Sequence, residues 1–353
     1  MRHAAGLLAL SFAVAATVHA EPQKAPQQIA KDPSALSDHT ALLTPIQVDS
    51  LTLTPIVATG PAAAGDEQLL VLDEAMAAKK VKIREISEGT VNSLTFINQA
   101  QQPVFVLAGE VILGGKQDRI IGRNTVIPAN TTQAVPVYCV ESGRWTGETK
   151  EFSTGKALAH GRLRGQASYR AQRDVWNEVA AKNVARKTVN SSDTYRRVAQ
   201  QQSDGTLGRM EKQVDEALAK LPAADRSRMV GYAVALNGDV ATVDVFGSPA
   251  LFKKLETKLV RSYLTEAIDI AARKDIKPPT STDVKAFMAD AEKAAEQRSY
   301  DTPAAETSVK GGERAFKAKV GYKKAAPARA NAKPDAAAAP EPAQTVYENY
   351  QAK

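Results

Sequence analysis

Cysteine is almost absent from the sequence, since its 353 residues include a single one, Cys139. An internal disulfide is therefore excluded, and the stability of the chain must come from its hydrophobic core. Apolar residues make up 43% of the sequence, which is enough to build such a core. Strand alternation around Cys139 predicts a buried core thiol. The alternative is a catalytic dyad with His160, which requires the two side chains to meet.

Histidine and aromatic residues are scarce as well. Of four histidines, only His39 and His160 follow the first twenty residues, so one chain cannot bind a metal ion through several histidines. We expect no metal and no cofactor. Aromatic residues make up 5% of the sequence, which argues against a stacking platform for single-stranded nucleic acid. The net charge of +7, or +6 without Arg2, is spread along the chain, so we expect no nucleic-acid partner.

Long hydrophobic runs are confined to residues 1–20. There Arg2 and His3 precede the apolar run AAGLLALSFAVAATV, and Val18-His19-Ala20 supplies small residues before Glu21. This arrangement is typical of a secretory signal peptide, and an uncut N-terminal anchor is the alternative. No later stretch approaches about 20 apolar residues, so we expect no transmembrane segment. The sequence thus predicts an exported protein, periplasmic or secreted.

Hydrophobic periodicity predicts an α+β fold for the rest of the chain. After a flexible leader at 21–40, residues 41–323 are expected to form one domain. Its N-terminal half is β-rich and mostly antiparallel, and helices and a hairpin complete it. Asn237-Gly238 predicts the hairpin turn, Ser248-Pro249 the start of a helix that runs to about Arg273, and residues 282–298 a further helix. Residues 324–343 are an Ala/Pro-rich disordered insertion, and 344–353 contain a possible closing strand.

Two polar clusters interrupt the apolar strands of residues 103–145, and we call them together the polar corner. The first is GGKQDR at Gly114–Arg119, and the second is ESGRW at Glu141–Trp145. The first is not a phosphate loop, because Gln117 stands where Ser or Thr is needed and a strand follows. Its donors and acceptors could hold a small anionic or polar ligand, or form a surface turn with internal ion pairs. The second cluster is either a binding corner or a salt-bridged sheet edge.

The predicted site residues all lie in or beside these clusters. The candidates for a catalytic acid or base are Glu110, Asp118 and Glu141. The predicted ligand-binding residues are Gly109, Gly114, Gly115, Lys116, Gln117, Arg119, Gly143, Arg144 and Trp145. We expect the two clusters to converge on a common cavity.

The run LAGEVILGGKQDRIIGRNTVIPANTTQAVPVYCVESGRW resembles the signature of a known domain family. This is the ARG and rhodanese-phosphatase-superfamily-associated protein domain, in which ARG stands for ADP-ribosylglycohydrolase. The resemblance rests on Gly109, Glu110, Gly114, Lys116, Gln117, Asp118, Arg119, Pro128, Pro136, Cys139, Glu141, Gly143, Arg144 and Trp145. It implies a link to ADP-ribose or nucleotide metabolism through gene association alone and brings no established reaction. The predicted export signal conflicts with a cytosolic role in ADP-ribose metabolism.

Three functions follow from these observations. The first is an exported binding or structural module whose polar corner holds a small anionic or polar ligand. The second is a hydrolase or transferase acting on an ADP-ribose- or nucleotide-like substrate, in which the carboxylates named above supply the acid or base and the basic residues grip the anion. The third is an envelope scaffold without a ligand site, which would bind a protein partner.

Overall fold

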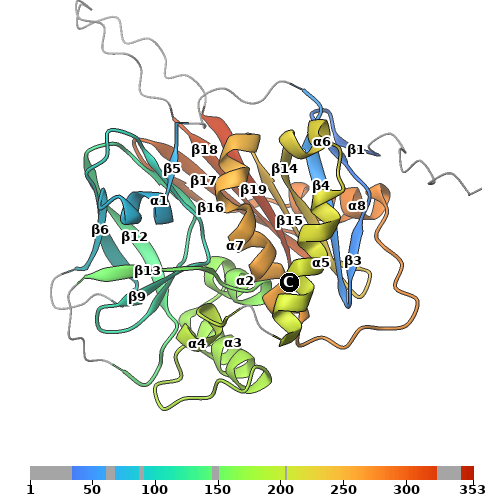
Figure 1. Cartoon of the computed structure of the whole chain (residues 1–353). Coiled ribbons are helices and arrows are strands. Elements are labelled where there is room, and N and C mark those ends of the chain that lie inside the picture. The colour runs from blue at the N-terminus through green and yellow to red at the C-terminus, as the bar shows by residue number, and fades with distance from the viewer. Residues whose placement is uncertain (1–33, 61–67, 87–90, 145–150, 203–204, 324–342) are drawn as a thin grey trace, which may run out of the picture. The chain divides into compact units, whose positions relative to one another are not determined.

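Short β-branched segments from both ends of the sequence pair into one large antiparallel sheet, seen in the computed structural model of the chain (Figure 1). The structure describes residues 34–60, 68–86, 91–144, 151–202, 205–323 and 343–353. The predicted signal peptide and nearly all of the Ala/Pro-rich insertion lie outside these ranges. The main sheet has ten strands in the order β1-β2-β4-β14-β15-β19-β18-β17-β16, and β3 also pairs with β4. Its strands are β1 (Ser34–Ser37), β2 (Thr40–Leu42), β3 (Ile46–Val48), β4 (Leu51–Ala58), β14 (Met229–Leu236), β15 (Asp239–Phe246), β16 (Glu296–Asp301), β17 (Ala305–Gly311), β18 (Ala315–Tyr322) and β19 (Gln344–Ala352).

The segment between β4 and the first long helices forms two smaller sheets. One has six strands in the order β13-β9-β10-β12-β7-β6, and the other has three in the order β11-β8-β5. Within the described ranges, β5–β8 is the one parallel pair. The elements are β5 (Leu70–Val71), α1 (Leu72–Ala77), β6 (Val81–Glu85), β7 (Ser93–Asn98), β8 (Val104–Val106), β9 (Glu110–Gly114), β10 (Arg119–Ile121), β11 (Thr125–Ile127), β12 (Thr131–Cys139) and β13 (Phe152–Leu158).

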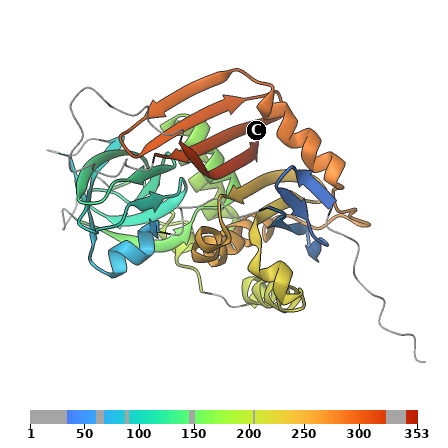
Figure 2. The same cartoon turned by 90° about the horizontal axis from the view of Figure 1, so that it is seen from above.

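Helices cover both faces of the main sheet. The apolar face of α7 packs with α5 against β14, β15 and β19 through Tyr232, Phe246 and Tyr347. On the opposite face, α8 packs against Val243 and Tyr350, and Figure 2 shows α7 and α8 on the two sides of the sheet. The helices are α2 (Gly161–Tyr169), α3 (Gln172–Ala185), α4 (Arg196–Ala199), α5 (Gly205–Ala219), α6 (Ala223–Ser227), α7 (Pro249–Ala267) and α8 (Ser281–Glu292).

The predicted fold class is confirmed, because the described residues form an α+β fold with antiparallel sheets and a strand-rich N-terminal half. The hairpin turn is also confirmed, since Asn237 and Gly238 take φ of +51° and +90° between β14 and β15. At the start of α7, the Ser248 side chain accepts a hydrogen bond from Leu251 N at 3.2 Å, as its position before a proline predicts.

Two predicted helix ends are wrong. α7 ends at Ala267 rather than near Arg273, and residues 271–275 are exposed and add no buried face that would extend it. The predicted helix over 282–298 stops at Glu292, and residues 296–301 form β16 instead. The reason is tertiary pairing: β16 bonds β17 at the edge of the main sheet, and this overrides the local helical preference of a polar segment.

Candidate functional site

The two polar clusters meet at one end of the six-stranded sheet. Gly114–Arg119 connects β9 to β10, and the second cluster follows β12, which pairs with β10. The backbone N–H of Asp118 donates to Glu141 Oε2 at 3.0 Å, and Arg144 Nη2 donates to the same oxygen at 2.7 Å. Arg144 Nη1 also donates to the carbonyl of Gly115 at 2.9 Å. The polar corner is therefore one contiguous network.

Asp118 is the buried centre of this network, with no exposed surface. Its carboxylate accepts from Gly114 N at 3.0 Å and Thr194 Oγ1 at 2.9 Å, and from Arg196 Nε and Nη2 at 2.9 and 2.6 Å. Arg144 Nη2 lies 3.6 Å from its Oδ1. Four donors leave the carboxylate little capacity for a ligand. Asp118 thus ties the segment before α4 to the sheet.

The side chains of Gln117 and Arg119 in the first cluster are buried as well. Arg119 is completely buried, and its Nη1 donates to Gln117 Oε1 at 3.3 Å. Arg119 Nη2 lies 3.9 Å from Glu85 Oε1, which also accepts from the backbone N–H of Lys116 at 3.0 Å. Glu85, at the end of β6, is a member of the corner that the sequence did not single out.

Glycines in both clusters allow neighbouring segments to approach them closely. Gly114 and Gly115 take φ of +124° and +53°, and a Cβ on Gly115 would lie 2.3 Å from Phe152 Cζ. Gly143 N donates to the carbonyl of Ser192 at 3.0 Å. Trp145, the last predicted member of the corner, lies outside the described residues.

Gly109 and Glu110 lie at the opposite end of β9 from Gly114, so the structure separates them from the corner. Glu110 is buried, accepts from Leu107 N at 2.9 Å and receives the Lys258 ammonium of α7 at 2.7 Å. The pKa of Glu110 is raised, chiefly by burial and also by the charge of Asp73, although Lys258 lowers it. Gly109 takes φ of +97°, with the Arg164 side chain packed against it. These residues hold β9 to the helices.

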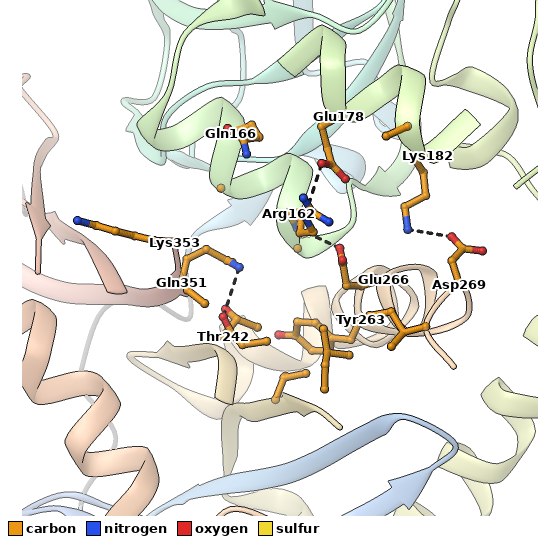
Figure 3. Close-up of a pocket in the computed structure, with 18 of the residues that line it drawn as sticks. Arg162, Gln166, Glu178, Lys182, Thr242, Tyr263, Glu266, Asp269, Gln351 and Lys353 are labelled. Atoms are coloured by element: carbon orange, nitrogen blue, oxygen red, sulfur yellow. Dashed lines mark hydrogen bonds and ion pairs between the residues drawn. The ribbon is translucent and has the colours of Figure 1, made fainter. Parts of the chain in front are cut away.

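A cavity of about 520 Å³ lies between α2, α3, the end of α7 and the main sheet (Figure 3). None of the site residues predicted from the sequence lines it. Its polar lining includes Arg162 and Gln166 of α2, Glu178 and Lys182 of α3, Glu266 of α7 and Gln351 of β19. Four cationic and three anionic side chains line it in all. We call it the helix–sheet cleft.

His160 is buried behind the wall of the helix–sheet cleft, at the start of α2. Its Nδ1 is 2.8 Å from the Tyr195 hydroxyl and its Nε2 is 2.9 Å from Glu178 Oε1. Burial raises the pKa of Tyr195 and keeps the phenol neutral. Burial also raises the pKa of Glu178, but the hydrogen bond and charge of His160 and the charges of Arg162 and Lys182 outweigh it and leave that pKa below the ordinary glutamate value. Because Glu178 is ionised and can only accept, His160 Nε2 carries the shared hydrogen.

Each anionic side chain of the cleft has a cationic or backbone partner. Two of the cationic side chains that line the cleft have no anionic partner within the described ranges. Asp269 binds Lys182 Nζ at 2.9 Å and Arg186 Nη1 at 3.2 Å. Arg170 and Lys353 are exposed at the other end, where both cations lie over the ring of Phe316, at 5.5 and 4.9 Å from its centroid. Within the described ranges, neither cation has a carboxylate at ion-pair distance. This end of the cleft therefore presents two cationic side chains without a described ion-pair partner.

Comparison with family models agrees with the resemblance of the sequence. The model of the ARG and Rhodanese-Phosphatase-superfamily-associated Protein domain matches residues 39–326. The chain belongs to this family. Neither the curated proteins nor the solved structures contain a match.

No helix within the described residues is long and apolar enough to span a membrane. No group of three or more His, Cys, Asp or Glu side chains in the same ranges is arranged to hold a metal ion.

The Cys139–His160 dyad does not form. The Cys139 thiol lies 4.0 Å from the carbonyl of Val91, and burial raises its pKa, whereas both ring nitrogens of His160 have other partners. The sequence pointed to His160 only through that dyad, and it singled out neither Glu178 nor Glu266. A usable signal was present: Gly161 and Gly165 one helical turn apart in α2 predict close packing of that helix against another element.

The depressed pKa of Glu178 predicts a pH-dependent contribution to stability. A carboxyl whose pKa is lower in the folded state stabilises the fold fully above its unfolded pKa, about 4.3, and loses this contribution as the pH falls through the folded value. We expect the difference in free energy of unfolding between wild type and Glu178→Gln to shrink as the pH falls from 5 to 3. Urea unfolding at several pH values measures it, and a constant difference over that range would contradict the assignment.

Proposed function

We propose that this protein is an exported binding module that holds a small anionic ligand in the helix–sheet cleft. The cleft volume of about 520 Å³ falls in the range of about 300–1,000 Å³ that is usual for small-molecule sites. Its lining combines the apolar side chains Val234, Leu236 and Ile270 with a few polar groups, the usual composition of such sites.

The observation that carries the proposal is the pair of cationic side chains without a described ion-pair partner. Arg170 and Lys353 are brought to one ring, Phe316, without a described carboxylate between them. Arg162 adds a third cation: its side chain is 70% exposed, and its ion pair with Glu178 is loose at 3.6 Å. Bringing like charges together is unfavourable in water, and an anionic ligand offsets this repulsion.

The polar corner is the weaker location for a ligand among the described residues. Its carboxylates and guanidinium groups bond one another, and Asp118 and Arg119 have no exposed surface. We therefore assign to the polar corner the role of holding the segment before α4 on the sheet, and we place the ligand in the helix–sheet cleft. Trp145 and residues 146–150 adjoin the corner in sequence, so a second site there stays a prediction.

A hydrolase or transferase acting on an ADP-ribose- or nucleotide-like substrate is the second candidate. The observation that favours it is the contact of two cleft carboxylates with one imidazole. Glu178 Oε1 and Glu266 Oε2 lie 2.9 and 4.0 Å from His160 Nε2. A histidine that holds a carboxylate at a cavity is the arrangement from which general acid–base catalysis is built. An envelope scaffold without a ligand is the third candidate.

A thermal-shift panel on the full chain tests the proposal. The probes are ADP-ribose, NAD, inorganic phosphate, simple carboxylates and acidic sugars. A ligand at about a hundred times its Kd adds about 2.7 kcal/mol to the free energy of unfolding. The unfolding midpoint should then rise by roughly 5–10 °C.

Two matched double variants make the panel specific. Arg162→Ala/Arg170→Ala removes two cleft cations and should abolish the shift. Arg209→Ala/Arg273→Ala removes two exposed arginines paired elsewhere and should preserve it. A flat panel, or a shift that survives the cleft variant, contradicts the proposed site. Turnover of ADP-ribose or NAD that is lost in Glu178→Gln would favour the enzyme, and a flat panel would favour the scaffold.

A further inference from the structure

The cleft contains an acceptor that the protein leaves unsatisfied. Gln351 is 5% exposed, and its Nε2 donates to the carbonyl of Ala241 at 3.3 Å. Its Oε1 is buried without a hydrogen-bond partner among the described residues. Gln351 lines the cleft, and a buried acceptor without a partner costs free energy, so a ligand donor that meets this oxygen after a small movement of the side chain would be favourable.

Two carboxylates beside Gln351 also retain acceptor capacity. Glu266 Oε2 accepts from the backbone N–H of Arg162 at 3.0 Å, and no hydrogen bond to its Oε1 occurs within the described part of the chain. Glu178 Oε1 binds His160, and its Oε2 has the 3.6 Å ion pair with Arg162. Figure 3 shows Glu178 and Glu266 on either side of Arg162, facing the same space as Gln351. The wall of the cleft therefore offers several acceptor oxygens to the donors of a ligand.

The packing of α2 gives Gln351 its position. A Cβ on Gly165 would lie 3.2 Å from Gln351 Cγ, and one on Gly161 would lie 3.7 Å from Gln351 Nε2. The two glycines lie one turn apart, so the same face of α2 leaves room for this side chain. Gln351 is thus held in a fitted slot and not at a mobile surface.

The charges of the cleft decide which donors fit. Ammonium groups and hydroxyl groups both donate, but a ligand ammonium would be repelled by the exposed guanidinium groups of Arg162 and Arg170. Neutral hydroxyl groups satisfy the acceptors without adding positive charge. Resting on the function proposed above, we infer that the ligand is a hydroxyl-rich acid: a sugar that carries a carboxylate or a phosphate. Its hydroxyl groups bind Gln351, Glu266 and Glu178, and its anionic group binds Arg162 and Arg170.

Isothermal titration of the full chain with matched probes tests this ligand class. Glucuronate and cyclohexanecarboxylate share a six-membered ring and one negative charge, but the second lacks hydroxyl groups. Ribose 5-phosphate and inorganic phosphate form the corresponding pair for a phosphate. We expect the hydroxylated member of at least one pair to bind at least tenfold more tightly, which corresponds to about 1.4 kcal/mol. The pair that responds identifies the anionic group.

Two variants connect the preference to the acceptors. Gln351→Met keeps the length of the side chain but has no amide oxygen, and Glu266→Gln keeps the shape but loses the charge. Both should reduce the preference at least tenfold while the affinity for the probe without hydroxyl groups changes less than about twofold. The unfolding midpoint of each ligand-free variant checks that it folds, and Arg273→Ala serves as the control with unchanged binding.

The outcomes separate this inference from the proposed function. Equal affinity within each pair overturns the hydroxyl-rich ligand and leaves an anion-binding cleft. A preference that survives both variants also overturns it, because the hydroxyl groups would then bind elsewhere. Tighter binding of a sugar amine than of the acid would reverse the charge argument. Binding of none of the probes would overturn the cleft as an anion site altogether.

Discussion

Replacing Asp244 with alanine should cost about 3–5 kcal/mol of the free energy of unfolding, because it leaves a buried arginine without its counter-ion. Asp244 lies on β15 and has no exposed surface. It accepts from Arg164 Nη2 at 3.0 Å, Tyr263 Oη at 2.5 Å and Asn349 Nδ2 at 2.9 Å, and also from the Tyr347 hydroxyl. Burial raises the pKa of Asp244, but Arg164 and the hydroxyl groups of Tyr263 and Tyr347 together lower it by more. The carboxylate therefore stays charged.

The matched control for this variant lies on the same strand. Asp239 is 82% exposed and paired with Arg273 at 3.5 Å, so Asp239→Ala should change the free energy of unfolding by less than about 1 kcal/mol. Urea unfolding of both variants gives the comparison. Adding Arg164→Met to Asp244→Ala should recover part of the loss, because no charge then remains buried. Equal losses for the exposed and the buried aspartate would contradict this account.

Asp118→Ala should have the second-largest effect, about 2–3 kcal/mol, because it removes the buried partner of two partly exposed guanidinium groups that water can then solvate in part. Arg196 would lose both hydrogen bonds to this carboxylate, and Thr194 would lose its own. Thr194 and Arg196 are joined to the six-stranded sheet through Asp118. The variant should therefore loosen α4 locally, in addition to lowering the free energy of unfolding of the whole fold.

Hydrogen exchange measures the local part of this prediction. In Asp118→Ala, the amides of α4 should exchange faster than the global loss of stability explains. The amides of α7 should exchange faster only by the amount that the global loss predicts. Glu151→Ala is the control, since the Glu151 side chain is 57% exposed and pairs with exposed Arg84. Uniformly faster exchange, or a loss below about 1 kcal/mol, would show that the corner does not hold α4.

Local features of the fold were predictable, and the cleft was not. The turn at Asn237-Gly238 and the cap at Ser248 depend on neighbouring residues, so their structure follows from the sequence around them. The polar corner is similar, because strand pairing between β10 and β12 brings its clusters together. By contrast, the cleft takes Arg162, Glu266 and Gln351 from two helices and the last strand, and their meeting depends on the packing of the whole sheet.

The position of β19 has a consequence for the synthesis of the protein. This strand comprises Gln344–Ala352, yet it lies between β15 and β18 in the interior of the main sheet. Until residue 352 has been made, β15 and β18 each present an open edge, and open edges recruit other strands and promote aggregation. The inward-facing charges of Asp244 on β15 and Lys317 on β18 are the kind of residue that discourages such pairing. The buried charges that stabilise the folded protein therefore also discourage aggregation of the incomplete chain.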